Sequence, residues 1–253
     1  MTHTLSRPLS IFWAVGLPLT LMSILLVAGT ERIDFALADA LYQPGLGFIG
    51  RHSEFLEDWL HDRAKQAVIA FALLCIAGWL LSLRYRPWQQ WRRPLGYLVL
   101  ALALSTAIIT PLKAITGVHC PWDLKRYGGD ETYTSLLEER APTLKPGRCW
   151  PAGHSSSGFS LFALYFLFRD RRPRLAQALL LGALTLGCIF SLGRMMQGAH
   201  FFSHNLWTAL FDWLICLGCY HLLLYRPNAL TTQRPAAPSS RDPLLHPGNE
   251  TAH

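Results

Sequence analysis

The chain has 253 residues, of which 51% are hydrophobic and only 15% are charged, and nine are tryptophan. This composition argues against an ordinary soluble domain and indicates a membrane protein. The formal net charge of +7 does not point to a nucleic-acid partner, because the arginines gather in short loops between hydrophobic stretches, where membrane topology explains them.

Six hydrophobic stretches follow one another along the chain, and we expect each to cross a membrane as a helix. The predicted spans are residues 11–29, 67–83, 95–112, 154–168, 175–192 and 206–224. The first lacks a convincing small-residue cleavage site and further spans follow it, so it is interpreted as an uncleaved helix. The predicted fold is an all-α, six-transmembrane helix bundle over residues 1–225. Residues 226–253, rich in Pro, Ser, Thr and Asn, are predicted to form a disordered tail.

Basic residues mark one side of this predicted bundle. Arg7, Arg226 and the arginine-rich segments 84–93 and 169–174 all fall on the side that holds the two termini. The positive-inside rule makes this side cytoplasmic. The polar segment 113–153 and the histidine-bearing segment after the fifth span then face the other side, which is the periplasm if the membrane is a bacterial inner membrane.

Two of the six cysteines differ from the others in their surroundings. Cys120 and Cys149 lie in the polar segment 113–153, and we predict that they form a disulfide if this segment faces an oxidising compartment. The other four lie in hydrophobic runs and are interpreted as small buried hydrophobic residues. These are Cys75, Cys188, Cys216 and Cys219.

The segment between the fifth and sixth predicted spans combines one arginine with two histidines. His200 and His204 are four residues apart and would share a helix face, and Arg194 lies six residues before His200. A fixed cation beside a titratable imidazole suits an anion, and phosphate is the obvious candidate. A metal site is the alternative, because two histidines at this spacing can bind zinc if His154 or His119 supplies a further ligand.

Three polar blocks on the outward side resemble, in order and spacing, the type-2 phosphatidic acid phosphatase superfamily, which also includes vanadium haloperoxidases and bacterial acid phosphatases. The pattern of that family is K-x6-R-P, then P-S-G-H, then S-R-x5-H-x3-D. The blocks here are Lys113-x6-Cys120-Pro121, Pro151-Ala152-Gly153-His154 and Gly193-Arg194-x5-His200-x3-His204. The resemblance implies a helical core of the acid phosphatase and haloperoxidase type, and a phosphorylated lipid as the substrate.

The resemblance also implies a role for each matching residue. His200 corresponds to the nucleophile that forms a phosphohistidine, and His154 corresponds to the general acid that protonates the leaving alcohol. Lys113 and Arg194 correspond to the cations that hold the phosphate oxygens. Backbone N–H groups from Gly153 to Ser155 would add to anion binding at a helix N-terminus. No metal or cofactor is needed for this chemistry, because the cations take its place.

Several positions depart from the family pattern. Ala152 and Gly193 replace the serines of the second and third blocks. Cys120 replaces the arginine that precedes the proline, so one phosphate-binding group is missing. We expect Arg126 to supply this charge, with Lys125 as the second choice.

The residue that orients the nucleophile also departs from the pattern, because His204 replaces the family aspartate. A neutral imidazole can accept the N–H of His200 and fix its tautomer, although it stabilises an imidazolium less than a carboxylate does. Asp123 is the candidate for a substitute carboxylate from another loop.

We therefore predict a metal-independent lipid phosphate phosphatase in a bacterial inner membrane, with its active site at the periplasmic face and both termini in the cytoplasm. Candidate substrates are phosphatidic acid, phosphatidylglycerophosphate, an isoprenyl diphosphate and a lipid A phosphate. Two alternatives stay open. One is a lipid phosphotransferase that passes the phosphate from the same intermediate to another lipid. The other is a catalytically inactive lipid-binding protein, which the changes at Cys120 and His204 favour.

Overall fold

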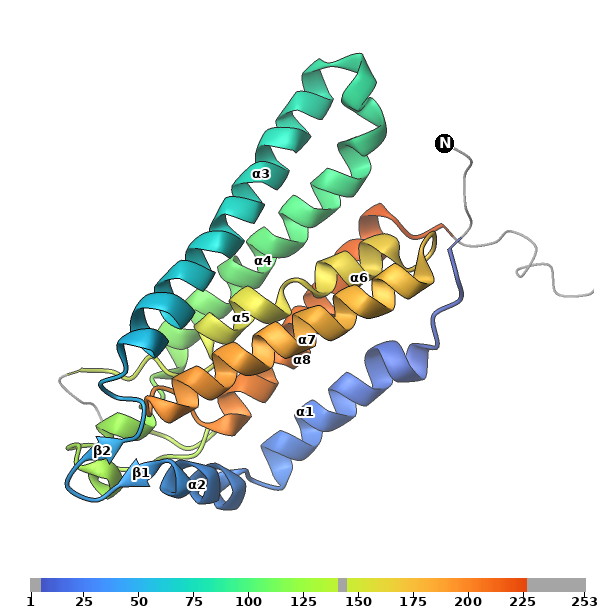
Figure 1. Ribbon diagram of the computed structural model, residues 1–253. Helices are drawn as coiled ribbons and strands as arrows, with labels where there is room; N and C mark the ends of the chain where they lie inside the picture. The colour runs from blue at the N-terminus through green and yellow to red at the C-terminus, as the bar shows by residue number, and fades with distance from the viewer. Residues whose placement is uncertain (1–5, 141–144, 227–253) are drawn as a thin grey trace, which may run out of the picture.

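The computed structural model describes residues 6–140 and 145–226, so the predicted tail over residues 227–253 lies outside the described residues. Helices dominate, and most of them run along one common direction (Figure 1). The α-helices are α1 Leu17–Val27, α2 Glu31–Ala40, α3 Ala64–Arg84, α4 Arg92–Thr116, α5 Gly153–Phe159, α6 Phe162–Phe168, α7 Pro173–Met196 and α8 Phe202–Leu223.

Shorter elements connect these helices. Two π-helical turns precede α1 and α3, three 3-10 turns flank α4, and two short strands form an antiparallel pair after α2. They are η1 Phe12–Gly16, η2 Phe55–Arg63, η3 Arg86–Trp91, η4 Pro121–Asp123, η5 Lys125–Tyr127, β1 Tyr42–Gln43 and β2 Gly47–Phe48. Apart from η1 and η3, these elements all lie at the end of the molecule that also holds α2 (Figure 1).

Four helices of the described chain are long and apolar enough to cross a membrane, and a fifth crossing is possible if a bent pair counts as one span. The four are Lys65–Arg84, Arg86–Asp123, Pro173–Met196 and Phe202–Leu223, and the bent pair is Phe12–Val27 with Glu31–Ala40, at an angle of 84°. The chain is thus a multi-pass helical membrane protein, but the six predicted spans are not all present as long helices.

The predicted span over residues 154–168 is the one that differs most. It consists of α5 and α6, which have seven residues each and are separated at Ser160 and Leu161. The backbone tightens there, because the Leu161 N–H donates to the Gly158 carbonyl at 3.2 Å and the Ala163 N–H donates to the Ser160 carbonyl at 3.1 Å. Gly158 also packs directly on the backbone of α7, since a Cβ atom at this position would lie 2.5 Å from the Gly187 nitrogen. Small residues at such contacts let membrane helices approach closely.

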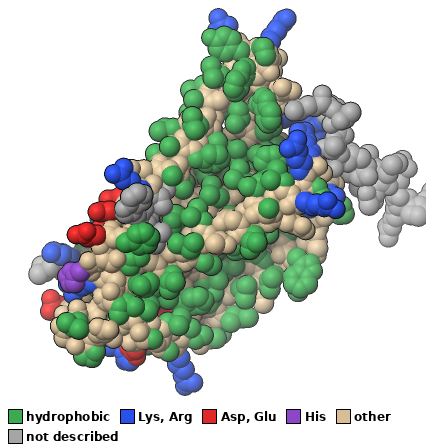
Figure 2. Space-filling view, in the orientation of Figure 1, with side chains coloured by type: hydrophobic (Ala, Val, Ile, Leu, Met, Phe, Trp, Pro, Cys, Tyr) green, Lys and Arg blue, Asp and Glu red, His purple; other side chains and the backbone are tan. Residues whose placement is uncertain are grey.

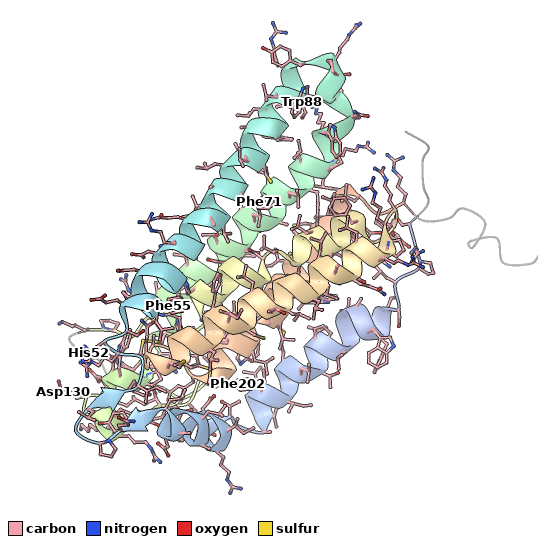
Figure 3. All side chains as sticks on the ribbon, viewed as in Figure 1. His52, Phe55, Phe71, Trp88, Asp130 and Phe202 are labelled. Atoms are coloured by element: carbon pink, nitrogen blue, oxygen red, sulfur yellow. A yellow bond between two sulfur atoms is a disulfide. The ribbon has the colours of Figure 1, made fainter. Side chains whose placement is uncertain are left out.

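The two ends of the molecule differ in chemical character. Trp88 marks the tip of the α3–α4 hairpin, whereas His52 and Asp130 lie at the opposite end (Figure 3). Hydrophobic side chains cover the flanks of the helices, and charged side chains lie mostly toward the ends (Figure 2). The two ends of the described chain meet, because the Ser6 N–H donates to the Arg226 carbonyl at 3.1 Å.

Aromatic residues fill the core between α4, α6 and α8. Tyr97, Phe166 and Tyr220 are at most 1% exposed, and the Tyr97 hydroxyl donates to the Cys216 carbonyl at 3.3 Å. Of the four cysteines interpreted as buried hydrophobic residues, three are buried as expected. Cys188 is exposed on the outer face of α7, so its expected burial is wrong.

A buried carboxylate fixes α2 to the start of α8. Asp34 is 2% exposed, and its two oxygens accept the Ser203 N–H at 2.8 Å and the Ser203 hydroxyl at 2.6 Å. The Thr30 hydroxyl donates to the same carboxylate at 2.7 Å. An acidic side chain at a helix N-terminus satisfies free N–H groups and complements the helix dipole. Asp34 therefore holds the segment that carries His200 and His204 in place.

We predict that Asp34→Ala lowers the free energy of unfolding by about 1–3 kcal/mol, because it leaves buried donors of Ser203 without an acceptor. Thermal unfolding of the purified protein in detergent measures this as a lower Tm. Glu54→Ala removes an exposed carboxylate and is the matched control. Equal Tm values for the two variants would contradict the role of Asp34.

Candidate active site

The end of α7 turns sharply and brings His200 to the start of α8. Gly198 has a φ of 75°, which favours glycine, and a Cβ atom there would overlap the Phe48 ring. The Gly198 N–H donates to the Met195 carbonyl, and the Ala199 N–H donates to the Arg194 carbonyl, both at 2.9 Å. This is the hydrogen-bonding pattern of a helix that ends at a left-handed glycine. Arg194 and His200 therefore lie on the two sides of one tight turn.

The start of α5 carries His154 and is fastened to the start of α8. The Ala152 N–H donates to the His204 carbonyl at 3.3 Å. The Thr208 hydroxyl lies 3.1 Å from the Ala152 carbonyl oxygen and 3.0 Å from that of His204, so it donates to this pair. One turn further on, the Ser155 hydroxyl is hydrogen-bonded to the Asn205 side-chain carbonyl. These buried contacts set the position of His154 relative to His200.

One cavity of about 620 Å³ brings together most of the predicted site residues. Its polar lining includes Lys113, His154, Arg194 and His200, which come from α4, α5, the end of α7 and the segment before α8. Gly153 lines it as well, and a Cβ atom at this position would lie 3.4 Å from Lys113 Nζ. The glycine thus gives the lysine ammonium room beside His154.

Side-chain contacts hold Arg194 at the rim of this cavity. Its guanidinium donates to Gln197 Oε1 at 2.7 Å, and the Gln197 amide donates to Glu57 Oε2 at 2.8 Å. Arg194 also lies over the Trp122 ring, 5.7 Å from its centroid. Its Nε atom is buried and has no hydrogen-bond partner among the described residues. Arg194 is therefore positioned by its neighbours beside the cavity.

The His200 ring is buried, and its surroundings favour the neutral imidazole. Burial lowers the pKa of His200 well below its ordinary value, and the positive charges of Lys113 and Arg194 and the nearby His204 ring lower it further. A neutral imidazole keeps a lone pair on one ring nitrogen, which is the form that a nucleophile requires.

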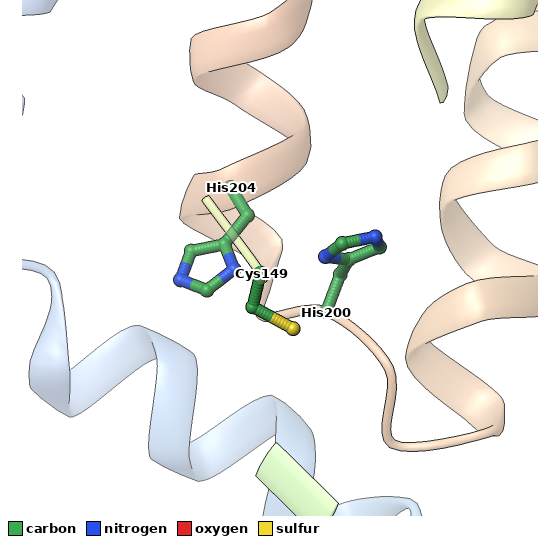
Figure 4. Close-up of side chains that lie close together, drawn as sticks. All are labelled: Cys149, His200 and His204. Atoms are coloured by element: carbon green, nitrogen blue, oxygen red, sulfur yellow. The ribbon is translucent and has the colours of Figure 1, made fainter. Parts of the chain in front are cut away.

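His204 lies beside His200 but does not orient it by the predicted hydrogen bond. The two ring centroids are 6.0 Å apart in an edge-to-face arrangement, and both Nδ1 atoms are buried without a hydrogen-bond partner among the described residues. Cys149 lies between the two rings (Figure 4). The contact between His204 and His200 in this structure is therefore a packing contact of the two rings.

Cys149 is joined to Cys120 by a disulfide across a sequence separation of 29 residues. This disulfide connects the loop after α4 to the two histidines. It also bears on the metal alternative, because one ligand atom each from Cys149, His200 and His204 lies within 4.8 Å of the others. A sulfur in a disulfide is not a thiolate, so Cys149 does not complete a zinc site in this form.

Arg126, which was expected to replace the missing family arginine, does not line the cavity. Its guanidinium binds the Asp39 carboxylate in a bidentate manner, with Nε–Oδ1 and Nη2–Oδ2 distances of 2.9 and 2.6 Å. This carboxylate raises the pKa of Arg126, and the guanidinium also lies 4.8 Å from the Phe35 ring centroid. Arg126 fastens its loop to α2.

The structure also places three further side chains that the sequence analysis considered for the site. The Asp123 carboxylate accepts the Cys120 N–H at 3.0 Å, so it caps η4 and does not orient His200. The Ser155 hydroxyl is hydrogen-bonded to the Asn205 side chain, and Ser155 is not part of the cavity lining. Its backbone belongs to the start of α5. His119 lies 3.6 Å from Glu131 in an ion-pair geometry and is a loop residue, as expected.

The cavity lining also includes polar residues that the motifs did not predict: Lys65, Thr106, Thr110, Ser156, Ser157 and Ser160. Lys65 lies at the start of α3 and Lys113 near the end of α4. Because α3 and α4 form a hairpin, these two ends meet at the same face of the membrane. The sequence did contain a signal for Lys65, because a lysine directly before the second predicted span lies at the same end of the bundle as Lys113.

The fold and this arrangement define a multi-pass helical membrane protein with two histidines and several cations around one cavity near a membrane face. The family model of the PAP2 superfamily matches residues 94–228, which is more than half of the chain. The chain therefore belongs to the PAP2 superfamily, and the predicted family is confirmed.

A solved structure shows the same fold. It is the crystal structure of the first transmembrane PAP2 type phosphatidylglycerolphosphate phosphatase from Bacillus subtilis, with a TM-score of 0.52 and 16% sequence identity. The match covers 83% of this chain and 94% of that chain. A search of curated proteins gives no significant match.

Proposed function

We propose that this protein hydrolyses the phosphate or diphosphate monoester of a membrane lipid, through a phosphohistidine formed on His200. Membership of the PAP2 superfamily and the fold of a transmembrane PAP2 phosphatase support a membrane lipid phosphatase. The observation that carries the lipid assignment is the shape and lining of the cavity, which joins the histidines and cations to an apolar groove inside the membrane-spanning region.

The apolar part of the cavity lies between α3 and α4. Its lining includes Val68, Ile69, Ala72 and Ile76 from α3 and Val99, Leu102 and Ala103 from α4. Ile76 follows Lys65 by eleven residues, which corresponds to about 16 Å along a helix axis. The cavity therefore has a charged end that suits a phosphate and a long apolar wall that suits an acyl or isoprenoid chain. A soluble phosphomonoester would leave this wall uncovered.

The proposed reaction has two steps. A neutral ring nitrogen of His200 attacks phosphorus, the bond from phosphorus to the lipid oxygen breaks, and His154 gives its proton to the leaving oxygen. In the second step His154 takes a proton from water, the water oxygen attacks phosphorus, and the bond from phosphorus to His200 breaks. The products are the dephosphorylated lipid and inorganic phosphate.

Cations at the charged end stabilise the phosphate during both steps. Lys113 and Arg194 take the roles that the family pattern implies. We assign Lys65 as the third cation, in place of the arginine that Cys120 replaces, because Lys65 lines the same cavity whereas Arg126 is bound to Asp39. Lys65 lies on α3, outside the three motif blocks, so a comparison of motifs does not reveal it.

The position of the site favours a particular membrane orientation. The arginine-rich loops lie at one end of the bundle, and His154 and His200 lie toward the other. By the positive-inside rule, we propose that the arginine-rich end is cytoplasmic and that the reaction takes place at the periplasmic face of a bacterial inner membrane. A disulfide between Cys120 and Cys149 fits an oxidising compartment on that side.

The purified protein in detergent is expected to release phosphate from at least one phosphorylated lipid without added metal. Phosphatidylglycerophosphate is the first substrate to test, because the solved PAP2 relative is named for it. Phosphatidic acid, an isoprenyl diphosphate and a lipid A phosphate complete the set. We expect His200→Ala and His154→Ala each to lower kcat at least about 10³-fold, since they remove the nucleophile and the general acid.

His52→Ala is the matched control, because His52 is an exposed loop residue at the same end of the molecule (Figure 3). It is expected to keep the activity of the unmodified protein. Wild-type-like activity of His200→Ala or His154→Ala would overturn the proposed mechanism, and no phosphate release from any of the four lipids would overturn the proposed function.

Lys65→Gln is expected to lower kcat/KM about tenfold for the same lipid, because it removes one of three cations that face the phosphate, and Lys65→Arg is expected to restore most of it. Lys125→Gln removes an exposed charge in η5 outside the cavity and is the control. The third-cation role fails if the Lys65→Gln and Lys125→Gln variants have the same kcat/KM.

A further inference from the structure

A second cavity, of about 350 Å³, lies at the arginine-rich end of the bundle, remote from His154 and His200. The start of α4, the ends of α6 and α8, and Ser6, the first described residue, surround it. Four arginines from three separate parts of the chain line it: Arg92, Arg93, Arg171 and Arg226. Such convergence from distant segments concentrates positive charge around one hollow.

Among the residues that line this cavity, one is acidic, Asp170, beside the four arginines. Asp170 accepts the Arg7 N–H at 2.9 Å and the Tyr220 hydroxyl at 2.6 Å. The Arg169 side chain, which is 8% exposed as a residue, lies 4.0 Å from the same carboxylate. Asp170 therefore already has its own partners, and the cavity has an excess of positive charge.

The rest of the lining is suited to a lipid. Phe166, Leu167, Leu223 and Leu224 provide an apolar wall where α6 and α8 end, and Gln89 and Gln90 add side-chain amides. Lipid phosphates lie at this depth, just beyond the ends of the membrane-spanning helices. Arginine binds phosphate oxygens with paired N–H donors, and basic pockets between helices are suited to anionic headgroups.

We propose that this cavity binds the phosphate of an anionic phospholipid headgroup in the leaflet opposite the catalytic site. The lipid would contact the start of α4 on one side and the ends of α6 and α8 on the other. The α3–α4 hairpin diverges from the other helices at this end (Figure 1), so a bound headgroup bridges the two parts of the bundle. The binding does not depend on phosphatase activity.

The test uses the full-length protein purified in a zwitterionic detergent and three matched forms: wild type, Arg92→Gln with Arg93→Gln, and Arg84→Gln with Arg86→Gln. Both double variants remove two exposed arginines from the α3–α4 hairpin, but only the first pair lines the cavity. The probes are short-chain phosphatidylglycerol, short-chain phosphatidylcholine and inorganic phosphate at equal concentration. The readout is the shift in Tm, because a ligand that binds the folded state raises it.

Phosphatidylglycerol is expected to raise the Tm of the wild type and of the Arg84/Arg86 variant, and to give less than half of that shift for the Arg92/Arg93 variant. Phosphatidylcholine and inorganic phosphate are expected to give no comparable shift. Equal shifts for the two double variants would overturn the proposed cavity. A full shift with inorganic phosphate alone would overturn the lipid assignment, and no shift of the wild type would overturn both.

Discussion

The structure depends on a line of buried polar contacts between α5 and α8. This α5–α8 contact line consists of Ala152 with His204, Thr208 with both of their carbonyls, Ser155 with Asn205, and Ser156 with Asp212. Inside a membrane, apolar surfaces gain little by meeting each other, so small residues and hydrogen bonds decide which helix faces meet. The two short helices α5 and α6 have no long span of their own. These contacts therefore determine where His154 stands relative to His200.

The cations around His200 are suited to bind an anion. Lys113 and Arg194 line one cavity with a buried imidazole, and the nearby carboxylate, Glu57, lies 4.0 Å from the Arg194 guanidinium. Like charges at close range repel each other and disfavour a protonated His200. In the proposed reaction, a bound phosphate would be attracted by the same cations that disfavour protonation of His200. The proposed roles of the cations are thus to bind the substrate and to favour the neutral form of the nucleophile.

Much of the site could be predicted from the sequence because the motif residues lie near helix ends. Lys113, His154, Arg194 and His200 are each within a few residues of a predicted span, so the alternation of spans was enough to bring them to one face. Lys65 belongs to no motif, and only the pairing of α3 with α4 shows that it faces the same cavity. The family assignment rested on order and spacing, and the PAP2 match confirms it.

The remaining features depend on contacts that no local pattern reveals. The Arg126 guanidinium binds Asp39, which lies 87 residues earlier in the chain, and Arg126 does not line the cavity. The predicted span 154–168 breaks at Ser160, where Gly158 packs against the α7 backbone, and hydrophobicity alone does not show this break. His204 packs beside His200, and one ligand atom of Cys149 lies within 4.8 Å of both rings, an arrangement that the spacing of the two histidines does not reveal.

The nucleophilic role of His200 is tested most directly by trapping the covalent intermediate. The enzyme would be mixed with a lipid substrate that carries radioactive phosphate, quenched in alkali within milliseconds, and digested for peptide mapping. The proposed mechanism predicts an alkali-stable, acid-labile label on the peptide that contains His200 in the wild type, and no label in His200→Ala. Phosphate release without any label on this peptide, or a label on another residue, would contradict the mechanism.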